Sequence, residues 1–445
     1  MTFTDLNLNK PLLNALTDLG YETPTTIQDK VFPVVMSERD VCGIAQTGTG
    51  KTIAYLLPSL RQFQFSPNHT PQLLVLVPTR ELVVQVVETV AALTKYMNVL
   101  TVGVYGGVNF KPQVAQVQAG ADVLVATPGR VVDLLANGTL KTKQLKRLVI
   151  DEFDEMLDLG FRAQLTTILD ALPPKRQNLL FSATLTPEVE QLMGTYFADP
   201  VRVEAAPVGT PAAKVEQTAY HVPNFNTKLN LLERLLREPT GENNSLSKVM
   251  LFVATKALAD QLHEELDGRF VESVGVIHAG LAQNHRFEAV RRFQAGELRV
   301  LIATDLVSRG IDLVGVSHVI NFDLPDEPES YIHRIGRTGR ADQKGQAIAF
   351  VTPTDAERLA AIEALMKKSV SVLPLPENLP ISTVLTEAEK PQVKMKIVEP
   401  KRPKPVEVGP AFHEKKAKNQ KTNVRRDYEA EKKAKYGKSY KRGRT

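Results

Sequence analysis

The stretch from Ala45 to Thr52, which reads Ala-Gln-Thr-Gly-Thr-Gly-Lys-Thr, constrains the fold of this 445-residue chain more than any other. It follows a short run at residues 40–44 and opens an apolar segment at residues 53–60. Backbone amides in a glycine-rich turn at a helix N-terminus can surround a pyrophosphate, a lysine can reach the β and γ phosphates, and a hydroxyl can ligate magnesium. The residues suited to these roles are Gly48, Gly50, Lys51 and Thr52. The pattern predicts a phosphate-binding loop with Ala45 in place of the first glycine, although a Gly-Lys-Thr turn can also be simple punctuation.

A phosphate-binding loop needs an acidic magnesium partner at the end of a later strand, and Asp151-Glu152 follows the apolar residues 148–150. The first carboxylate can hold magnesium, and the second can orient or deprotonate an attacking water. The alternative is that these acids only cap a helix that begins near Met156, because acidic residues favour that end. The presence of Lys51 favours the catalytic interpretation.

Short apolar runs alternate with helical patterns between residues 20 and 205, as in a doubly wound parallel sheet buried on both faces. The predicted strands are residues 72–77, 122–126, 145–150 and 177–181. Each is followed at once by a polar cluster, at residues 78–81, 127–130, 151–154 and 182–184. Because ligands bind beyond the carboxyl ends of such strands, we expect the chemistry to line one edge of the sheet.

The same pattern restarts in the second half of the chain. Further strands are predicted at residues 248–253, 272–277, 299–303, 317–321 and 345–351, with a helix at residues 256–266. The small, proline-rich stretch 205–213 has the composition of a linker. We therefore expect two α/β domains with a cleft between them. The predicted boundaries are 1–206 and 214–370 for the domains, 207–213 for the linker and 371–445 for an extension and tail.

The net charge of +5 is unevenly distributed. Residues 391–445 carry 18 Lys/Arg against 6 Asp/Glu, whereas residues 1–390 carry 37 against 44. This basic composition predicts a disordered tail. Its cations alternate with Tyr428, Tyr436 and Tyr440, so we also expect it to contact nucleic acid by phosphate pairing and stacking.

The chain has no apolar run near the roughly 20 residues that span a bilayer, and its start lacks the features of a signal peptide. The single Cys42 excludes an internal disulfide and a cysteine-based zinc site. These observations predict a soluble, cytoplasmic protein.

Residues 331–340 read Tyr-Ile-His-Arg-Ile-Gly-Arg-Thr-Gly-Arg. This segment contains three arginines and two glycines, a composition that suits neither a helix interior nor a buried strand. Arginines offered across a cleft can stabilise charge on a transferring phosphoryl group, an effect of roughly 10³ to 10⁵ in rate. Arg337 and Arg340 are the predicted fingers. The alternative is a basic patch for RNA phosphates.

In this order, these pieces resemble the DEAD-box family of ATP-dependent RNA helicases across roughly residues 3–370. The resemblance implies an α/β fold of two tandem RecA-like doubly wound parallel-sheet domains with a disordered basic C-terminal tail. It implies ATP and Mg²⁺ as cofactors, with nucleotide contacts from Phe3, Tyr21, Gln28, Ala45, Gln46, Thr47, Gly48, Thr49, Gly50, Lys51, Thr52 and Asp312. Catalysis would use Lys51, Asp151, Glu152, Arg337 and Arg340, and the metal would be held by Thr52 and Asp151.

The resemblance also implies an RNA path across both domains, through Arg80, Gly107, Thr127, Arg130, Gln283, Arg286 and Thr304. Residues that connect the ATP and RNA sites would be Asp154, Ser182, Thr184 and His333. Two positions depart from the family pattern, since Phe153 and Ser308 both stand where alanine is usual. We expect Phe153 to point away from the nucleotide into the packing between sheet and helix, and the small change at Ser308 to have little effect.

The implied activity is ATP hydrolysis coupled to RNA binding and to local duplex unwinding or remodelling of RNA–protein complexes. The implied partners are single-stranded or duplex RNA, with ribosome-assembly intermediates as a further expectation, and the protein is expected to be a monomer. The overall look is similar to the RhlE-like bacterial branch. A non-catalytic RNA clamp and a DNA translocase with the same domains are the alternatives. All the catalytic positions are present, which disfavours the clamp. Phe3 and residues 20–28 look like the family's adenine-selecting motif, in which the aromatic ring would stack on the base and Gln28 would read its edge. This match and the match of residues 78–82 disfavour the translocase.

Overall fold

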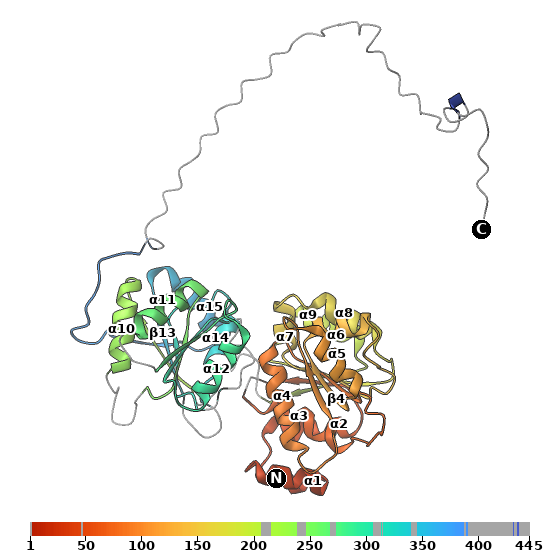
Figure 1. Ribbon diagram of the computed structural model, residues 1–445. Coiled ribbons are helices and arrows are strands. Elements are labelled where there is room, and N and C mark those ends of the chain that lie inside the picture. Colours follow the sequence, from red (N-terminus) through yellow and green to blue (C-terminus); the bar gives the residue numbers. More distant parts are fainter. Residues whose placement is uncertain are drawn as a thin grey trace. The chain divides into compact units, whose positions relative to one another are not determined.

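Two sheets of seven parallel strands organise the protein in a computed structural model (Figure 1). The structure describes residues 2–45, 48–205, 215–237, 246–267, 273–305, 313, 315–339, 345–386, 389, 430 and 434–435. Residues up to 390 form one compact unit, and residues 391–445 are a separate unit. The linker predicted at residues 207–213 and nearly all of the basic tail lie outside the described residues.

The first sheet has the order β3-β4-β2-β5-β6-β1-β7. Its strands are β1 (Val41–Ile44), β2 (Leu73–Leu76), β3 (Thr101–Val104), β4 (Val123–Ala126), β5 (Arg147–Ile150), β6 (Gln177–Ser182) and β7 (Val201–Glu204). The second sheet has the order β10-β11-β9-β12-β13-β8-β14. Its strands are β8 (Val215–His221), β9 (Val249–Phe252), β10 (Val274–Ile277), β11 (Val300–Ala303), β12 (His318–Asn321), β13 (Gly345–Val351) and β14 (Ser371–Leu373).

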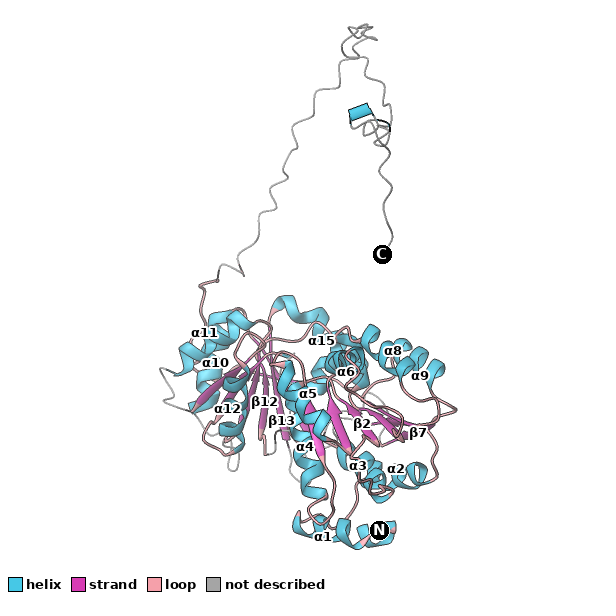
Figure 2. Cartoon of the chain, turned by 45° about the vertical axis from the view of Figure 1, so that its right-hand side comes forward, coloured by secondary structure: helices cyan, strands magenta, loops and turns pink. Residues whose placement is uncertain are grey.

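Helices connect the strands, as parallel pairing requires. In the first half they are α1 (Lys10–Asp18), α2 (Thr26–Met36), α3 (Lys51–Arg61), α4 (Arg80–Leu93), α5 (Phe110–Ala119), α6 (Pro128–Ala136), α7 (Phe153–Asp158), α8 (Arg162–Ala171) and α9 (Pro187–Tyr196), after a 3₁₀ turn at Phe3–Leu6. In the second half they are α10 (Phe225–Arg237), α11 (Lys256–Asp267), α12 (Gln283–Gln294), α14 (Pro328–Ile335) and α15 (Ala356–Met366), with a 3₁₀ turn at Pro353–Asp355. Figure 2 shows strands and helices in contrasting colours.

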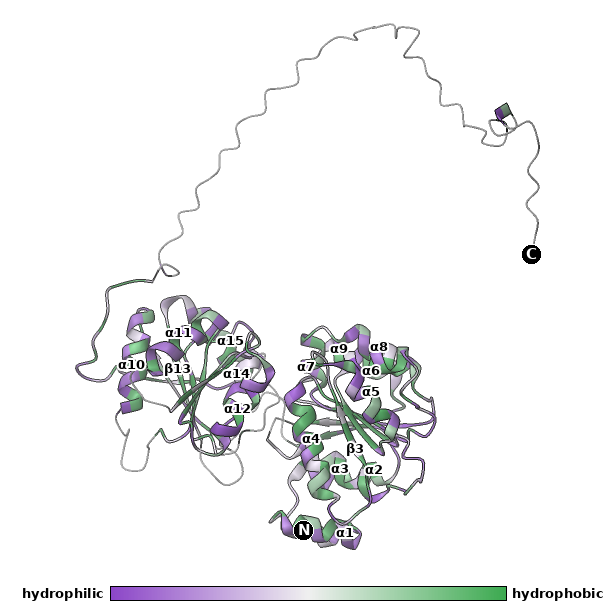
Figure 3. Cartoon of the chain, viewed as in Figure 1, coloured by the Kyte–Doolittle hydropathy of each residue, from purple (hydrophilic) through white to green (hydrophobic). Residues whose placement is uncertain are grey.

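Each central strand is buried on both faces because helices cover both sides of its sheet. In β5, Val149 belongs to the core cluster that α2, α3 and α4 complete, whereas Leu148 and Ile150 belong to the cluster that α6, α8 and α9 complete. The second sheet repeats this arrangement with separate cores on its two faces. Figure 3 shows the apolar strands inside helices whose outward turns are hydrophilic. This double burial explains why the central strands read as continuous apolar runs.

The structure confirms the doubly wound fold and every strand that the sequence predicted, with shifts of one or two residues at the ends. The short run noted at residues 40–44 forms β1, and the structure adds four strands that the apolar pattern did not indicate: β3, β7, β8 and β14. Three of these are edge strands, and β8 lies next to an edge. Since β14 pairs with β8, the second sheet continues past residue 370, where we expected the domain to end.

Among the residues that the structure describes, no helix is both long enough and apolar enough to cross a membrane.

Candidate functional site

The polar clusters of the first half gather at the carboxyl edge of its sheet, as the sequence predicted. They follow β1, β2, β4, β5 and β6 directly, and these five strands are neighbours in one parallel sheet. Parallel strands end at the same edge, so segments more than a hundred residues apart in the chain meet there.

The phosphate-binding loop joins β1 to α3 and is braced by the start of α2. Gly50 caps α3 with φ of 89°. Gln28 Nε2 donates to the Gly50 carbonyl at 3.1 Å, and the Thr25 hydroxyl donates to the Thr49 carbonyl at 2.8 Å. A Cβ on Gly50 would overlap Gln28 Nε2. Glycine is therefore required at position 50 by both its backbone conformation and its neighbour.

The side chain of Gln28 has a second partner, because its Oε1 accepts from the Thr25 amide at 2.9 Å. The structure thus uses this buried amide to hold the loop, and its predicted reading of an adenine edge stays a prediction. Phe3 is also buried, with 4% of its surface exposed, and it packs in the first core cluster. Stacking of a base on Phe3 therefore needs local movement. Tyr21 is 46% exposed.

Lys51, Asp151 and Glu152 are all buried at this edge. Burial raises the pKa of Asp151 to about 6, although the charge of Lys51 opposes the rise. Tyr55, one turn into α3, was missed by our sequence analysis. Burial raises the pKa of its hydroxyl well above the usual value, and the charge of Asp151 adds to this effect. The site therefore combines one buried cation with two buried acids.

Glu152 occupies the left-handed region with φ of 53°, and its amide donates to Asp151 Oδ1 at 3.0 Å. Its Oε2 is buried without a hydrogen-bond partner among the described residues. An orphaned carboxylate oxygen beside a second carboxylate suits a water or cation that arrives with a ligand. The described residues hold no group of three His, Cys, Asp or Glu placed to bind a metal. Magnesium at this site would therefore take most of its ligands from phosphates and water, as it commonly does.

Phe153 is fully buried in the core cluster on the α6, α8 and α9 side of the sheet, which confirms that it packs away from the solvent-facing edge. Its neighbour Asp154 connects β5 to β6. Asp154 Oδ2 accepts from the amide and the hydroxyl of Thr184, both at 2.8 Å, and the Asp154 amide donates to Ser182 Oγ at 3.3 Å. The structure thus brings the three predicted coupling residues of the first half together.

Burial by itself would raise the pKa of Asp154, but the charges of His333 and Lys51 and the hydrogen bonds from Thr184 and Ser182 outweigh it and lower this pKa. His333 comes from α14 in the second half, and its Nδ1 lies 3.4 Å from Glu155 Oε1. Arg337 is also buried, and its Nε donates to the His333 carbonyl at 3.3 Å. The predicted coupling histidine therefore stands next to the acidic segment of the first half.

Arg334 is a second site residue, after Tyr55, to which our sequence analysis gave no role. It is 2% exposed, and its guanidinium donates to both oxygens of Asp305, at 2.5 and 2.6 Å. It also donates to Asn321 Oδ1 at 3.0 Å and lies over the ring of Phe252. This buried arginine ties α14 to the ends of three strands of the second sheet. The feature that could have pointed to this role is the position of Arg334 on the buried face of α14.

Six of the seven predicted RNA contacts lie in two groups, and Thr304 lies apart from both. Arg80 Nη1 donates to Gln283 Oε1 at 3.1 Å, and its guanidinium lies over Gly107, where any Cβ would overlap it. Arg286 Nη2 lies 3.1 Å from Glu81 Oε1, and both side chains are buried. These two contacts join α4 to α12.

Arg130 and Thr127 form the second group, at the start of α6. Arg130 donates to the Val108 carbonyl at 3.1 Å and lies over the ring of Phe110. Thr127 Oγ1 accepts from the Gly106 amide at 3.3 Å. A cavity of about 490 Å³ is lined by Arg80, Gly106, Thr127, Arg130, Ala279 and Arg286, among others. Thr304 is buried at the end of β11 and does not line this cavity.

Four predicted site residues lie outside the described part of the chain: Gln46, Thr47, Asp312 and Arg340. Ser308 does so as well.

Comparison with known proteins identifies the family. The DEAD/DEAH box helicase family matches residues 25–192, and the helicase conserved C-terminal domain matches residues 227–342. The RNA helicase CrhR of Synechocystis is 38% identical over 88% of this chain and 78% of its own length. The DEAD-box ATP-dependent RNA helicase RhpA of Helicobacter pylori is 38% identical over 86% of this chain and 77% of its own length.

Solved structures agree with this match. S. cerevisiae Dbp5 bound to RNA and ADP BeF3 aligns with a TM-score of 0.76 and 31% identity, over 84% of this chain and 96% of the Dbp5 chain. Mss116p bound to ssRNA and AMP-PNP aligns with a TM-score of 0.77 and 25% identity, over 84% and 80%. The two parallel sheets are therefore tandem RecA-like domains, and this chain belongs to the DEAD-box family and is an ATP-dependent RNA helicase.

Proposed function

We propose that the carboxyl edge of the first sheet binds and hydrolyses ATP with the residues that meet there. The observation that carries this proposal is the burial of Lys51, at the start of α3, and of Asp151 and Glu152, after β5. One Glu152 oxygen there has no hydrogen-bond partner among the described residues. Lys51 and the amides of the Gly48–Gly50 turn bind the phosphates. Thr52 and Asp151 hold Mg²⁺, which neutralises phosphate charge when it is bound.

Glu152 orients the attacking water and accepts its proton in this proposal. Arg337 and Arg340 stabilise the charge that develops on the γ phosphate. Phe3, Tyr21, Gln28, Ala45, Gln46, Thr47, Thr49 and Asp312 complete the nucleotide contacts.

The RNA strand lies against the cavity that Arg80, Thr127, Arg130 and Arg286 line, with Gly107, Gln283 and Thr304 close to its path. Contacts from arginines and backbone amides reach phosphates and sugars, so they position RNA without reading its sequence. Contacts to 2′-hydroxyls distinguish RNA from DNA. Dbp5 and Mss116p, which align with both halves of this chain, were solved with RNA, and this supports the proposal.

The two sites communicate through Asp154, Ser182, Thr184 and His333. The hydrogen bonds from the β6 end to Asp154, and the charge of His333 on the same carboxylate, support this role. A change at the nucleotide edge would therefore alter the position of α14 relative to α7.

We further propose that the protein is a cytoplasmic monomer that acts on RNA–protein complexes such as ribosome-assembly intermediates, and that it belongs to the RhlE-like branch. We propose that the first domain ends at residue 206, that residues 207–213 are a linker, and that the second domain begins at residue 214 and includes β14.

The deciding experiment measures ATP hydrolysis with and without single-stranded RNA for the intact chain, for Glu152→Gln and for Glu188→Gln. Glu188 is a matched control because its side chain is exposed at the start of α9. We expect RNA to stimulate hydrolysis in the intact chain and in the control. Glu152→Gln should lose about 10²-fold or more, since general-base catalysis contributes roughly 10² to 10⁴.

Three other results are informative. Equal rates for Glu152→Gln and the intact chain would remove Glu152 from the mechanism. Binding of ATP and RNA without hydrolysis by the intact chain would favour the clamp. Equal stimulation by DNA and RNA would favour the translocase.

A further inference from the structure

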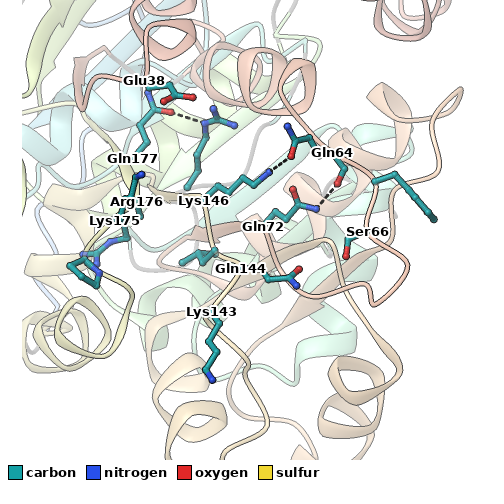
Figure 4. Close-up of a pocket in the computed structure, with 14 residues that line it drawn as sticks. Glu38, Gln64, Ser66, Gln72, Lys143, Gln144, Lys146, Lys175, Arg176 and Gln177 are labelled. Atoms are coloured by element: carbon teal, nitrogen blue, oxygen red, sulfur yellow. Dashed lines mark hydrogen bonds between the residues drawn. The ribbon is translucent and has the colours of Figure 1, made fainter.

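The first sheet also has a hollow at its opposite edge, where β2, β5 and β6 begin. This cavity has a volume of about 780 Å³ and is drawn in Figure 4. It is lined by Glu38 after α2, by residues 64–66 and 72 before β2, by residues 143–147 around the start of β5, and by residues 174–177 around the start of β6. It is therefore separated by the length of the sheet from the nucleotide site at the carboxyl edge.

The lining of this cavity is strongly basic. It contains five cationic residues, Lys143, Lys146, Arg147, Lys175 and Arg176, and a single acid, Glu38. Every described hydrogen bond from these cations goes to a neutral amide or carbonyl oxygen, and none of the five lies within 4.0 Å of a carboxylate among the described residues. No cation of the cavity is therefore in a close ion pair within the described structure, although the more distant charges of Glu38 and Asp40 act on Arg147 and Arg176.

Two of the five cations are fixed in place. Arg147 is buried and donates to Gln177 Oε1 at 2.6 Å and to Gln62 Oε1. Arg176 donates to the Pro173 carbonyl at 2.8 Å and to Asn178 Oδ1 at 2.9 Å. The protein therefore holds both arginines in place, and their charges make the electrostatic potential of the cavity positive.

The three lysines are the groups available to a ligand. Lys143 and Lys175 are exposed and have no hydrogen bond or ion pair in the described part of the chain. Lys146 is exposed and donates to Gln64 Oε1 at 2.7 Å, a surface contact that an anion can replace. Flexible ammonium groups over a fixed positive field suit phosphate groups.

Two further groups suit a nucleobase. Phe65 is 61% exposed and lines the cavity, so its ring is open to stacking. Gln72 is 6% exposed, and its Nε2 donates to the Gln64 carbonyl at 2.6 Å. This bond fixes the amide so that Oε1 is buried without a partner in the described structure. A donor such as the exocyclic amine of a base would satisfy this oxygen after a local shift that exposes it to the cavity.

We propose that this hollow is a second nucleotide-binding site, in which Lys143, Lys146 and Lys175 hold phosphates and Phe65 stacks on a base near Gln72. The bound nucleotide is either part of an RNA strand that also occupies the carboxyl edge or a free nucleotide. The first of these two sources rests on the proposed function. Because the site lies at the opposite edge, it extends the RNA footprint beyond the cleft.

The test compares Lys143→Gln/Lys146→Gln/Lys175→Gln with Lys10→Gln/Lys367→Gln/Lys368→Gln. The control lysines are exposed and line no cavity described above. Affinity is measured against salt for strands of about 10 and about 30 nucleotides, because one binding module occupies roughly 4 to 16. We expect the first variant to bind the long strand more weakly and its log–log salt slope to fall by about 2, at 0.7 for each lost contact. Binding of the short strand should not change.

Phe65→Leu gives an independent readout, since losing one stacked base weakens binding roughly fivefold or more. If the site takes free nucleotides, RNA affinity will be unchanged at both lengths, and the number of AMP molecules bound at saturation will fall from two to one. The proposal is overturned if the first variant matches the control in RNA affinity, salt slope and AMP stoichiometry. It is overturned equally if the first variant matches the control in all three but no longer binds an acidic protein partner. Stimulation of the ATPase by the short strand reports separately on the proposed function.

Discussion

Individual residues at the carboxyl edge depend on backbone conformations that most residues avoid. Glu152 has φ of 53°, and a left-handed conformation costs an L-residue about 1 to 2 kcal/mol. The bond from its amide to Asp151 Oδ1 helps to hold this conformation at the junction of β5 and α7. Gly107 has φ of 75° and lies under the Arg80 guanidinium. At both positions the backbone determines where a charged group lies.

Gly107→Ala should weaken RNA binding, because the added Cβ displaces Arg80 as well as straining the backbone. Loss of one charge-assisted hydrogen bond is worth about 1.5 to 3 kcal/mol, which is roughly tenfold or more in affinity. Gly194→Ala in α9 is the matched control, since a Cβ there meets nothing within 4 Å and Gly194 does not line the RNA cavity. Equal RNA affinities for the two variants, measured by equilibrium titration, would show that Arg80 does not contact RNA.

At the scale of elements, buried polar pairs determine how helices sit on their sheets. In the second half, Arg334 on α14 reaches Asp305 after β11, Asn321 in β12 and the Asp323 carbonyl. In the first half, Gln28 on α2 reaches the loop that precedes α3. Each contact joins an element to a strand end that carries a functional motif. The helices therefore position the motifs as well as covering the core.

Arg334→Lys should destabilise the second half by about 3 kcal/mol, because a lysine cannot replace the two-pronged contact and leaves Asp305 poorly paired. Arg358→Lys is the control. Arg358 is 42% exposed at its side chain, and its ion pairs with Asp326 and Asp355 should contribute at most about 1 kcal/mol. Urea unfolding followed by circular dichroism measures both, and similar midpoints for the two variants would contradict the assigned role of Arg334.

At the scale of the whole molecule, the chain consists of a compact unit that ends at residue 390 and a strongly basic remainder. The last part of the compact unit contributes two segments to the second half, the strand β14 and residues 380–384, which we call the strap. β14 pairs with β8, and the carbonyls of Pro380, Ser382 and Val384 accept from three asparagines that lie just before α10 and in its first two turns. The fold therefore requires residues beyond 370.

Truncation separates these two parts of the chain. Ending the chain after residue 390 should leave the thermal midpoint unchanged, because the compact unit is complete. Ending it after residue 370 should lower the midpoint by several degrees, since it removes β14 and the strap. Equal midpoints for the two truncated chains would mean that these segments add no stability.

The chain that ends after residue 390 also tests whether the tail binds RNA. Removing residues 391–445 takes away 18 Lys/Arg. If the tail contacts phosphates, RNA affinity should fall and the salt dependence should flatten, by roughly 0.7 in log–log slope for each lost contact. An unchanged slope in a salt titration would exclude phosphate contacts from the tail.

The sequence by itself determined the fold class, the central strands and the edge that carries the chemistry. Each of these features is encoded by a short stretch of sequence. A strand buried on both faces must be a continuous apolar run, and a phosphate-binding loop must keep its residues in order. Phe153 could be placed in the core because the residues of the strand beside it alternate between the two faces of the sheet. The sequence missed β3, β7, β8 and β14, which mix polar and apolar residues because they lie at or beside the edge of a sheet.

Only the tertiary structure decided which distant groups meet. The Arg334–Asp305 pair, the contact from Gln28 to Gly50 and the field of Asp151 on Tyr55 each join residues that lie far apart in the chain. The basic hollow at the amino edge has the same origin, since its lysines come from the approaches to two different strands. No local pattern predicts such groups, because the order of strands in a sheet differs from their order in the sequence.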